Sequence, residues 1–202
     1  NIGFTDSLNI AVFVPLYDKI LIDYPHLDLS IQSHHSSELY GMLSEHNIDI
    51  GFVYHQLHYK NIISEKLFEE KLYLLQSEHP VVEKELFLSW DDNFQIWHDR
   101  WLSSVSRPHI SADTITLLDR LWKNADTWMI APESVIHELS RYRKVYVSEL
   151  KNPAPNRICY KIKHKYPKTT SKRAVELFEE ILEQFLHLER KEIPIGEIWG
   201  GR

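Results

Sequence analysis

The first 54 residues alternate short apolar runs with longer segments whose apolar residues recur at helical spacing. The short runs cover residues 2–4, 27–31 and 48–53, and the longer segments cover residues 8–24 and 38–45. This alternation predicts the succession β-α-β-α-β. Strands joined by helices in this way form a parallel sheet with right-handed crossovers.

Small hydroxyl or acidic residues precede both predicted helices. Thr5, Asp6 and Ser7 come before the first helix, and the run SHHSS at residues 33–37 comes before the second. Both helix starts follow the carboxyl ends of adjacent strands, where open α/β sheets bind ligands. Backbone N–H groups and helix dipoles there would attract an anion or a carboxylate. Each residue taken alone is also explained as a helix cap, so it is their pairing that favours a binding site.

The motifs of this stretch resemble the opening of the effector-binding domain of LysR-type transcriptional regulators. That family has a strand ending in Gly-x-x-x-Ser, a helix with a proline midway, Tyr-Pro before the next strand, Ser-x-x-Leu at a helix start and a strand of the form Asp-apolar-Gly/Ala-apolar. The order and spacing of the matching residues carry the resemblance, which covers nearly the whole chain. The matches are Gly3, Ser7, Pro15, Tyr24-Pro25, Ser36 or Ser37 with Leu39, and Asp49 with Gly51.

The resemblance implies an α/β fold of two Rossmann-like lobes joined by a two-strand hinge, similar to type II periplasmic binding proteins. We expect lobe I at residues 1–75 and 164–192, lobe II at 76–163, a hinge near 75–77 and a frayed C-terminal tail at 193–202. A second β-α-β-α succession after residue 108 agrees with two similar lobes. The DNA-binding domain of such a regulator is expected to be absent from this chain.

The function implied is that of a cytoplasmic sensor. A small anionic metabolite would bind in the cleft between the lobes and alter DNA binding through dimer or tetramer geometry, with DNA contacted only by the missing N-terminal domain. The helix at residues 8–23 is apolar on more than one face, which fits a homodimer contact or burial within one lobe. The alternative is a periplasmic solute-binding protein of a transporter, which shares the fold.

Matching motif positions imply which residues hold the effector. Ser7 and Ser36 or Ser37 would donate to an anionic ligand, and His34 would add a pH-sensitive charge. Trp128, which stands where the family usually has glycine, would shape the floor of the cleft together with Pro132. The predicted effector-binding residues are Asp6, Ser7, His34, Ser36, Ser37 and Tyr54 in lobe I, and Asp91, Thr114, Trp128 and Pro132 in lobe II.

The run at residues 86–102 is rich in aromatic side chains. Trp90, Phe94, Trp97 and Trp101 are spaced to lie on one face of a helix. Core packing explains most such stripes, so the residues just before the helix, 89–92, are the better candidates for a binding site.

Other functions find little support. Asp6, Ser7 and His34 or His35 do not form a credible catalytic triad, so no enzyme activity is expected. No metal site or cofactor is predicted, because His55 with His58 is a chance spacing among twelve histidines. The net charge of −6 argues against nucleic-acid binding by this chain itself. No apolar run reaches the roughly 20 residues that span a bilayer, and Cys159 reads as a buried, inert thiol.

Overall fold

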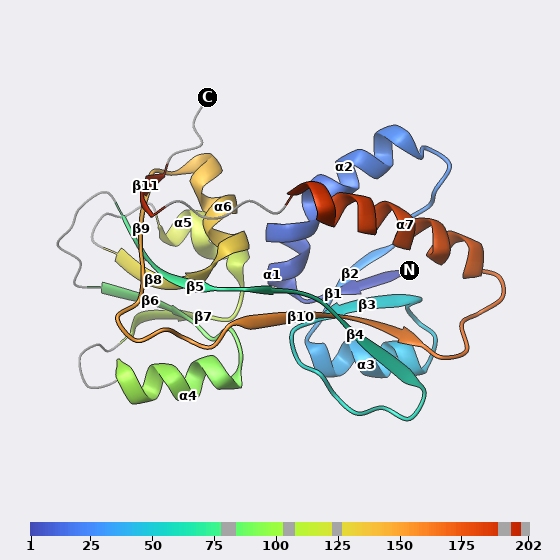
Figure 1. Cartoon of the computed structure of the whole chain (residues 1–202), viewed down its shortest axis with the longest axis horizontal. Coiled ribbons are helices and arrows are strands. Elements are labelled where there is room, and N and C mark those ends of the chain that lie inside the picture. Colours follow the sequence, from blue (N-terminus) through green and yellow to red (C-terminus); the bar gives the residue numbers. More distant parts are fainter. Residues whose placement is uncertain (78–83, 103–107, 123–126, 190–194, 199–202) are drawn as a thin grey trace. The chain divides into compact units, whose positions relative to one another are not determined.

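The computed structural model describes residues 1–77, 84–102, 108–122, 127–189 and 195–198. They form two compact units. Unit 1 is Asn1–Phe68 with Ile158–Lys191, and unit 2 is Glu69–Arg157 with Glu192–Arg202. Each unit has its own sheet with helices on both faces (Figure 1). The predicted two-lobed α/β fold is therefore confirmed.

Unit 1 is built on a five-stranded sheet of order β2-β1-β3-β10-β4. β1 (Ile2–Phe4) pairs in parallel with β2 (Ile31–Ser33) and with β3 (Ile50–Val53), which confirms the predicted parallel succession. β10 (Arg157–His164) runs antiparallel to β3, and β4 (Ile62–Glu70) forms the far edge.

The second strand lies later in the chain than predicted. The sequence places it at residues 27–31, whereas β2 begins at Ile31, the register partner of Ile2. Leu27 and Leu29 pack against the core without joining the sheet. Their apolar character therefore reflects packing against the core and not membership of a strand.

The first helix of unit 1 runs through three consecutive segments. α1 (Asp6–Leu8) leads into the π-helix η1 (Asn9–Phe13), which leads into α2 (Val14–Asp23). Pro15 lies in the first turn of α2. Because proline has no N–H and its ring crowds the preceding turn, a regular α-helix is disfavoured just before it, and the wider π turn stands at that place.

Two further helices complete unit 1. α3 (Ser36–Ser44) covers one face of the sheet, and α7 (Lys172–Glu189) covers the other face together with α2 (Figure 1). The rings of Phe4, Phe13 and Phe52 meet under α2, with centroids 4.7–4.9 Å apart. Cys159 is fully buried in the same cluster.

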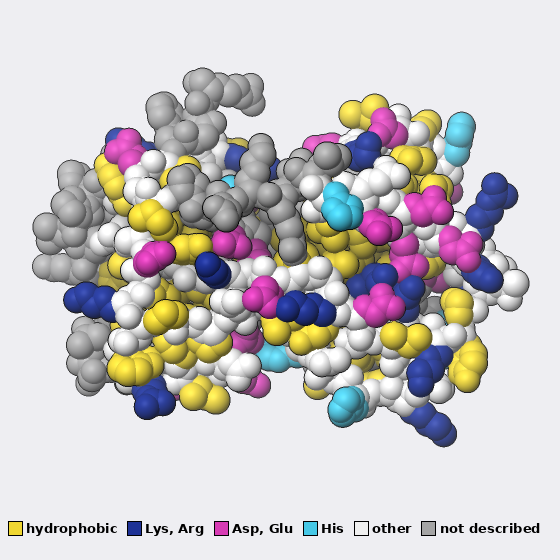
Figure 2. All heavy atoms as spheres, in the orientation of Figure 1, with side chains coloured by type: hydrophobic (Ala, Val, Ile, Leu, Met, Phe, Trp, Pro, Cys, Tyr) yellow, Lys and Arg dark blue, Asp and Glu magenta, His cyan; other side chains and the backbone are white. Residues whose placement is uncertain are grey.

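A charged network lies over β10, β4 and α7 in unit 1. Lys161 Nζ is 2.5 Å from Glu179 Oε1 and 2.9 Å from Glu65 Oε2, and Lys163 Nζ is 2.8 Å from Glu179 Oε1. Basic and acidic side chains are accordingly intermixed on the visible face of this unit (Figure 2). Lys161 and Lys163 thus form ion pairs with Glu65 and Glu179. Such pairs are typical of a solvated structural face.

Unit 2 is built on a six-stranded sheet of order β11-β9-β5-β8-β6-β7. The parallel part consists of β6 with its neighbours β7 and β8, while β5 runs antiparallel to both of its neighbours, β8 and β9. The strands are β5 (Leu72–Gln76), β6 (Lys84–Leu88), β7 (Pro108–Ala112), β8 (Thr127–Pro132), β9 (Val145–Ser148) and β11 (Gly196–Ile198).

The predicted hinge at residues 75–77 is wrong. β5 belongs wholly to the sheet of unit 2, where it pairs with β8 and β9. The chain instead passes between the units within two long strands, β4 and β10, at Phe68/Glu69 and Arg157/Ile158. The predicted lobe boundaries at 75/76 and 163/164 therefore lie too late in the chain at both crossings.

The helices of unit 2 are α4 (Asp92–Trp101), the short η2 (Ile115–Leu117) with α5 (Leu118–Leu121), and α6 (Glu133–Tyr142). The predicted aromatic stripe is only partly right. Trp90 precedes α4, Phe94 and Trp97 are buried, and Trp101 is 43% exposed. Residues 84–88, before Trp90, form the largely buried strand β6. The helical spacing of the aromatic residues did not indicate this strand.

The C-terminal segment is not simply a frayed tail. Residues 196–198 form β11, which pairs antiparallel with β9, and Lys144 Nζ lies 2.8 Å from Glu197 Oε1. The strand therefore completes the edge of the unit 2 sheet. Residues 124–126, whose sequence Asn-Ala-Asp is typical of a turn, lie outside the described residues.

Candidate functional site

The predicted residues of unit 1 lie where its three parallel strands end. Asp6 and Ser7 follow β1, residues 33–37 follow β2, and Tyr54 follows β3. Carboxyl ends of parallel strands share one edge of the sheet, so the fold brings these segments together there. Ser7 and Ser36 are largely buried, whereas His34 and Ser37 are exposed.

Glu38 caps the residue that precedes α3. His35 donates its backbone N–H to Glu38 Oε2 at 3.0 Å, and His34 Nδ1 lies 3.6 Å from the same carboxylate oxygen. Glu38 therefore forms an ion pair with His34 whenever that imidazole is protonated. Ser36 is the first residue of the helix, within the turn whose N–H groups have no helical partner.

Asn9 is a polar residue near this edge that the sequence analysis did not single out. Its Nδ2 donates to Ser33 Oγ at 2.8 Å, and its Oδ1 accepts from the Tyr17 hydroxyl at 2.6 Å. Burial raises the pKa of Tyr17 well above its usual range, so this hydroxyl stays protonated as a donor. Asn9 opens the π-helical turn, and it ties that turn to the end of β2.

Tyr54 belongs mainly to the core of unit 1. Its side chain is 8% exposed and lies in the cluster that also contains Phe68 and Cys159. The ring therefore serves packing in the core of unit 1.

Two predicted residues of unit 2 are helix caps. Asp91 Oδ1 accepts the Phe94 N–H at 2.8 Å at the start of α4, and Thr114 Oγ1 accepts the Thr116 N–H at 3.2 Å at the start of η2. Both follow carboxyl ends of parallel strands, β6 and β7. Capping accounts for these contacts, and the same edge position keeps both residues candidates for a ligand.

Trp128 and Pro132 do not form one floor. They lie near opposite ends of β8, four residues apart, which corresponds to about 13 Å along an extended strand. Pro132 is at the carboxyl end beside α6, whereas Trp128 is opposite Gln76 and Glu85 at the amino end. The shared role assigned to them from the sequence is therefore wrong.

The amino terminus of α6 already holds a carboxylate. Glu70 is 5% exposed, and its Oε1 accepts the Ser134 N–H at 2.9 Å. Burial, together with the charge of Glu70, raises the pKa of Glu133, which also accepts from the Tyr73 hydroxyl at 3.3 Å. The attraction of this helix end for anions is thus directed at the chain's own glutamate.

Trp90 and Arg157 form a second polar feature of unit 2. The indole N–H of Trp90 donates to the Ile130 carbonyl at 2.7 Å, and the Arg157 guanidinium lies 4.9 Å from the Trp90 ring centroid. Arg157 is 2% exposed. No sequence pattern indicated this cation, because Arg157 is far from Trp90 along the chain.

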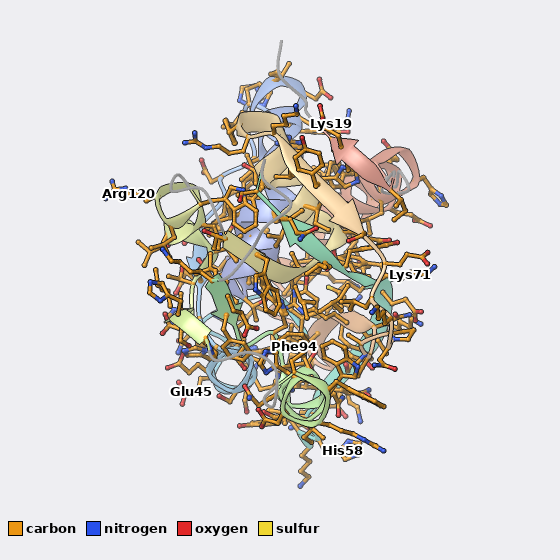
Figure 3. The ribbon with its side chains drawn as sticks, turned by 90° about the vertical axis from the view of Figure 1, so that its left-hand side faces the viewer. Lys19, Glu45, His58, Lys71, Phe94 and Arg120 are labelled. Carbon is orange, nitrogen blue, oxygen red and sulfur yellow. The ribbon has the colours of Figure 1, made fainter. Side chains whose placement is uncertain are left out.

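The described residues were compared with the requirements of a metal site and of a membrane-spanning helix. No cluster of three or more His, Cys, Asp or Glu side chains is arranged to hold a metal ion there. His58 points outward from its loop (Figure 3). No helix among the described segments is long and apolar enough to cross a lipid bilayer.

Residues 1–186 match the family model of the LysR substrate binding domain. The chain belongs to this family. LysR substrate binding domains are the effector-binding domains of transcriptional regulators and are not enzymes. The family match does not favour a periplasmic solute-binding protein. No curated protein sequence matches the chain.

Solved structures of LysR-type regulatory domains share this fold. The regulatory domain of MexT, a transcriptional activator in Pseudomonas aeruginosa, has a TM-score of 0.73 at 13% identity, over 91% of this chain and 98% of that one. The reduced OxyR regulatory domain from the same organism has a TM-score of 0.72 at 15% identity, over 94% and 96%. A BenM effector-binding-domain variant has a TM-score of 0.67 at 18% identity, over 93% and 94%.

Proposed function

We propose that this LysR-family domain senses a small anionic metabolite and passes the signal to a DNA-binding domain elsewhere in its protein. The observation that carries the proposal is the pair of largely buried serines, Ser7 and Ser36, after two adjacent parallel strands of unit 1. Two hydroxyls at such an edge, beside the N–H groups of the nine-residue helix α3, suit a carboxylate.

The charge pattern of unit 1 defines how the anion would be held. Residues 5–7 and 33–37 contain no lysine or arginine. Recognition therefore depends on hydroxyls, backbone amides and the dipole of α3, with Asn9 and Ser33 as further polar groups nearby. His34 adds positive charge when it is protonated, and Ser37 and Asp6 line the same edge.

The charge pattern of unit 2 supports assigning the anionic group to unit 1. Glu70 and Glu133 place two carboxylates at the start of α6, where a second anion would be repelled. Asp91, Thr114 and Pro132 lie at the carboxyl edge of the unit 2 strands and remain candidates for ligand contacts within that unit.

Transmission would run through self-association. Val14, Leu21 and Ile22 on α2 are 40%, 72% and 78% exposed, which is unusual for large apolar side chains on one helix. This surface suits a homodimer, or a tetramer built from dimers. Effector binding would shift the balance between two such assemblies and so reposition the DNA-binding domains in the cytoplasm.

A thermal-shift screen tests the proposal. The panel contains di- and tricarboxylates, amino acids and aromatic acids, and a ligand in excess over its Kd should stabilise the fold by about 1–4 kcal/mol. Ser7→Ala and Ser36→Ala should each abolish the shift. Ser44→Ala, at the exposed end of α3, is the matched control and should retain it. The proposal would be contradicted if no compound raised the Tm. It would also be contradicted if both variants kept the full thermal shift.

A further inference from the structure

His46 adopts a backbone conformation that is uncommon for its residue type. Its φ is 59°, the only positive φ of a non-glycine residue in the described part of the chain. It follows α3, where His46 N–H donates to the Leu43 carbonyl and Asn47 N–H donates to the Met42 carbonyl. Glycine or asparagine usually takes this position. A histidine kept in this left-handed conformation is a candidate for a functional role of its side chain.

The imidazole of His46 meets a second imidazole from another element. His164, at the end of β10, has its ring centroid 4.3 Å from that of His46, with 54° between the ring planes. The two residues are distant in sequence but belong to the same unit. Imidazole rings from two separate elements of unit 1 therefore lie in contact.

The second ring is also fixed in orientation. The Tyr166 N–H donates to His164 Nδ1 at 3.1 Å, and the same Nδ1 lies 2.9 Å from the Tyr166 carbonyl oxygen, so the tautomer of the ring decides which of the two contacts Nδ1 makes. When Nδ1 carries the proton and donates to that carbonyl, Nε2 presents its lone pair. Metal-bound histidines are commonly held in this way, with the other ring N–H on a backbone carbonyl.

We propose that His46 and His164 form a two-imidazole site for a divalent transition-metal ion. Imidazole suits Cu²⁺, Ni²⁺ and Zn²⁺, and the order of intrinsic affinities places Cu²⁺ first. Two protein ligands leave the remaining positions to water, unlike structural zinc sites, which are closed by four protein ligands. The ion would link the end of α3 to β10.

The neighbouring charges make this a site of moderate affinity. Lys168 Nζ donates to the His46 carbonyl at 2.6 Å, and its ammonium opposes a second cation nearby. Glu45, next to His46, accepts from Asn47 Nδ2 at 3.0 Å and contributes the opposing negative charge.

Two substitutions separate metal binding from simple ring packing. His46→Gly removes one imidazole and relaxes the left-handed backbone, so the fold is retained. His164→Phe keeps a ring against His46 but has no nitrogen. The control is the double substitution His55→Gln with His58→Gln, which removes two histidines from the exposed loop of the same unit.

The experiment is isothermal titration of tag-free protein with NiCl₂ and with ZnCl₂ at pH 7.5, followed by NMR of the histidine rings with trace Cu²⁺. We expect one ion per chain, at least tenfold weaker binding in each single variant, unchanged binding in the control, and broadening of the His46 and His164 resonances first. Absence of binding to the wild-type chain overturns the proposal. So does wild-type affinity in either single variant, or equal loss in the control.

Discussion

In unit 2, the Nε2 atom of His98 lies 2.6 Å from the Oε1 atom of Glu85, and both side chains are almost completely buried. The contact joins α4 to β6. The rings of Phe87 and Phe94 pack against the imidazole, with centroids 4.6 Å and 5.9 Å away. Polar groups in so apolar a setting depend on each other, because neither can be solvated.

Replacing His98 should therefore destabilise unit 2 strongly. His98→Ala leaves the Glu85 carboxylate without its imidazole partner, at an expected loss of about 3–5 kcal/mol in the free energy of unfolding. Urea denaturation followed by tryptophan fluorescence measures it. His109→Ala, an exposed histidine on β7, should change stability by less than about 0.5 kcal/mol. A small effect at His98 would mean that the pair is not coupled as the geometry indicates.

The glycines of the unit 1 sheet should not tolerate a methyl group. Gly3 and Gly51 are register partners, and an added Cβ would lie 2.8 Å from Ile48 Cδ1 at Gly3 and 2.8 Å from Ile162 Cγ1 at Gly51. Gly3→Ala and Gly51→Ala should each cost about 1–3 kcal/mol. Gly41→Ala is the control.

Gly41 lies within α3 with open space around an added Cβ. Its replacement by alanine should raise stability by about 0.4–1 kcal/mol, because the unfolded chain loses conformational freedom. Thermal unfolding of the three variants compares them directly. Equal effects at all three positions would rule out close packing as the reason for the glycines.

Glu133 should make unit 2 less stable as pH rises. Burial and the charge of Glu70 raise its pKa in the folded state. Between the unfolded pKa and this higher folded pKa, the folded chain binds more protons, so stability falls as pH increases through that window. Glu133→Gln should remove this slope above pH 4.5 and stabilise the domain at pH 7 by less than about 1 kcal/mol. Unfolding curves from pH 4 to 8 test it, with Glu149→Gln as an exposed control.

The exposed apolar surface of α2 should control self-association. Leu21→Glu and Ile22→Glu place charge at positions that are 72% and 78% exposed, so folding is unaffected. Each should convert a dimer to a monomer if α2 forms the contact, because an unpaired buried charge is strongly disfavoured at an interface. Sedimentation velocity reports the mass. Tyr142→Glu, 65% exposed on α6 of unit 2, should leave it unchanged.

The sequence predicted the elements that local periodicity defines. The run from Ile2 to Val53 was recognisable because strand and helix spacings differ, and the family motifs are concentrated there. The hinge was misplaced because a strand pattern does not say which sheet the strand joins, and β5 pairs only with elements far along the chain. The conflict between the aromatic stripe and β6 arose because apolar runs of that length fit either structure.

The positions of candidate residues could be predicted where they depend on strand ends, but not where they depend on long-range contacts. Ser7 and Ser36 come shortly after β1 and β2, so their position at the edge of the sheet could be predicted from the sequence. Glu70 reaches Ser134 and Arg157 reaches Trp90 only after the chain has folded, and no spacing rule links them. Trp128 was assigned to a floor from its motif position, but the length of β8 separates it from Pro132.

The short strand β11 has a practical consequence for anyone trimming this domain. A chain that stopped before residue 195 would keep every helix described here, yet Val145, Tyr146 and Val147 would lose the neighbour that covers their backbone. An uncovered outer strand recruits strands from other molecules. Such a shortened protein should come out of expression as oligomers and precipitate, even though each half of it has folded correctly.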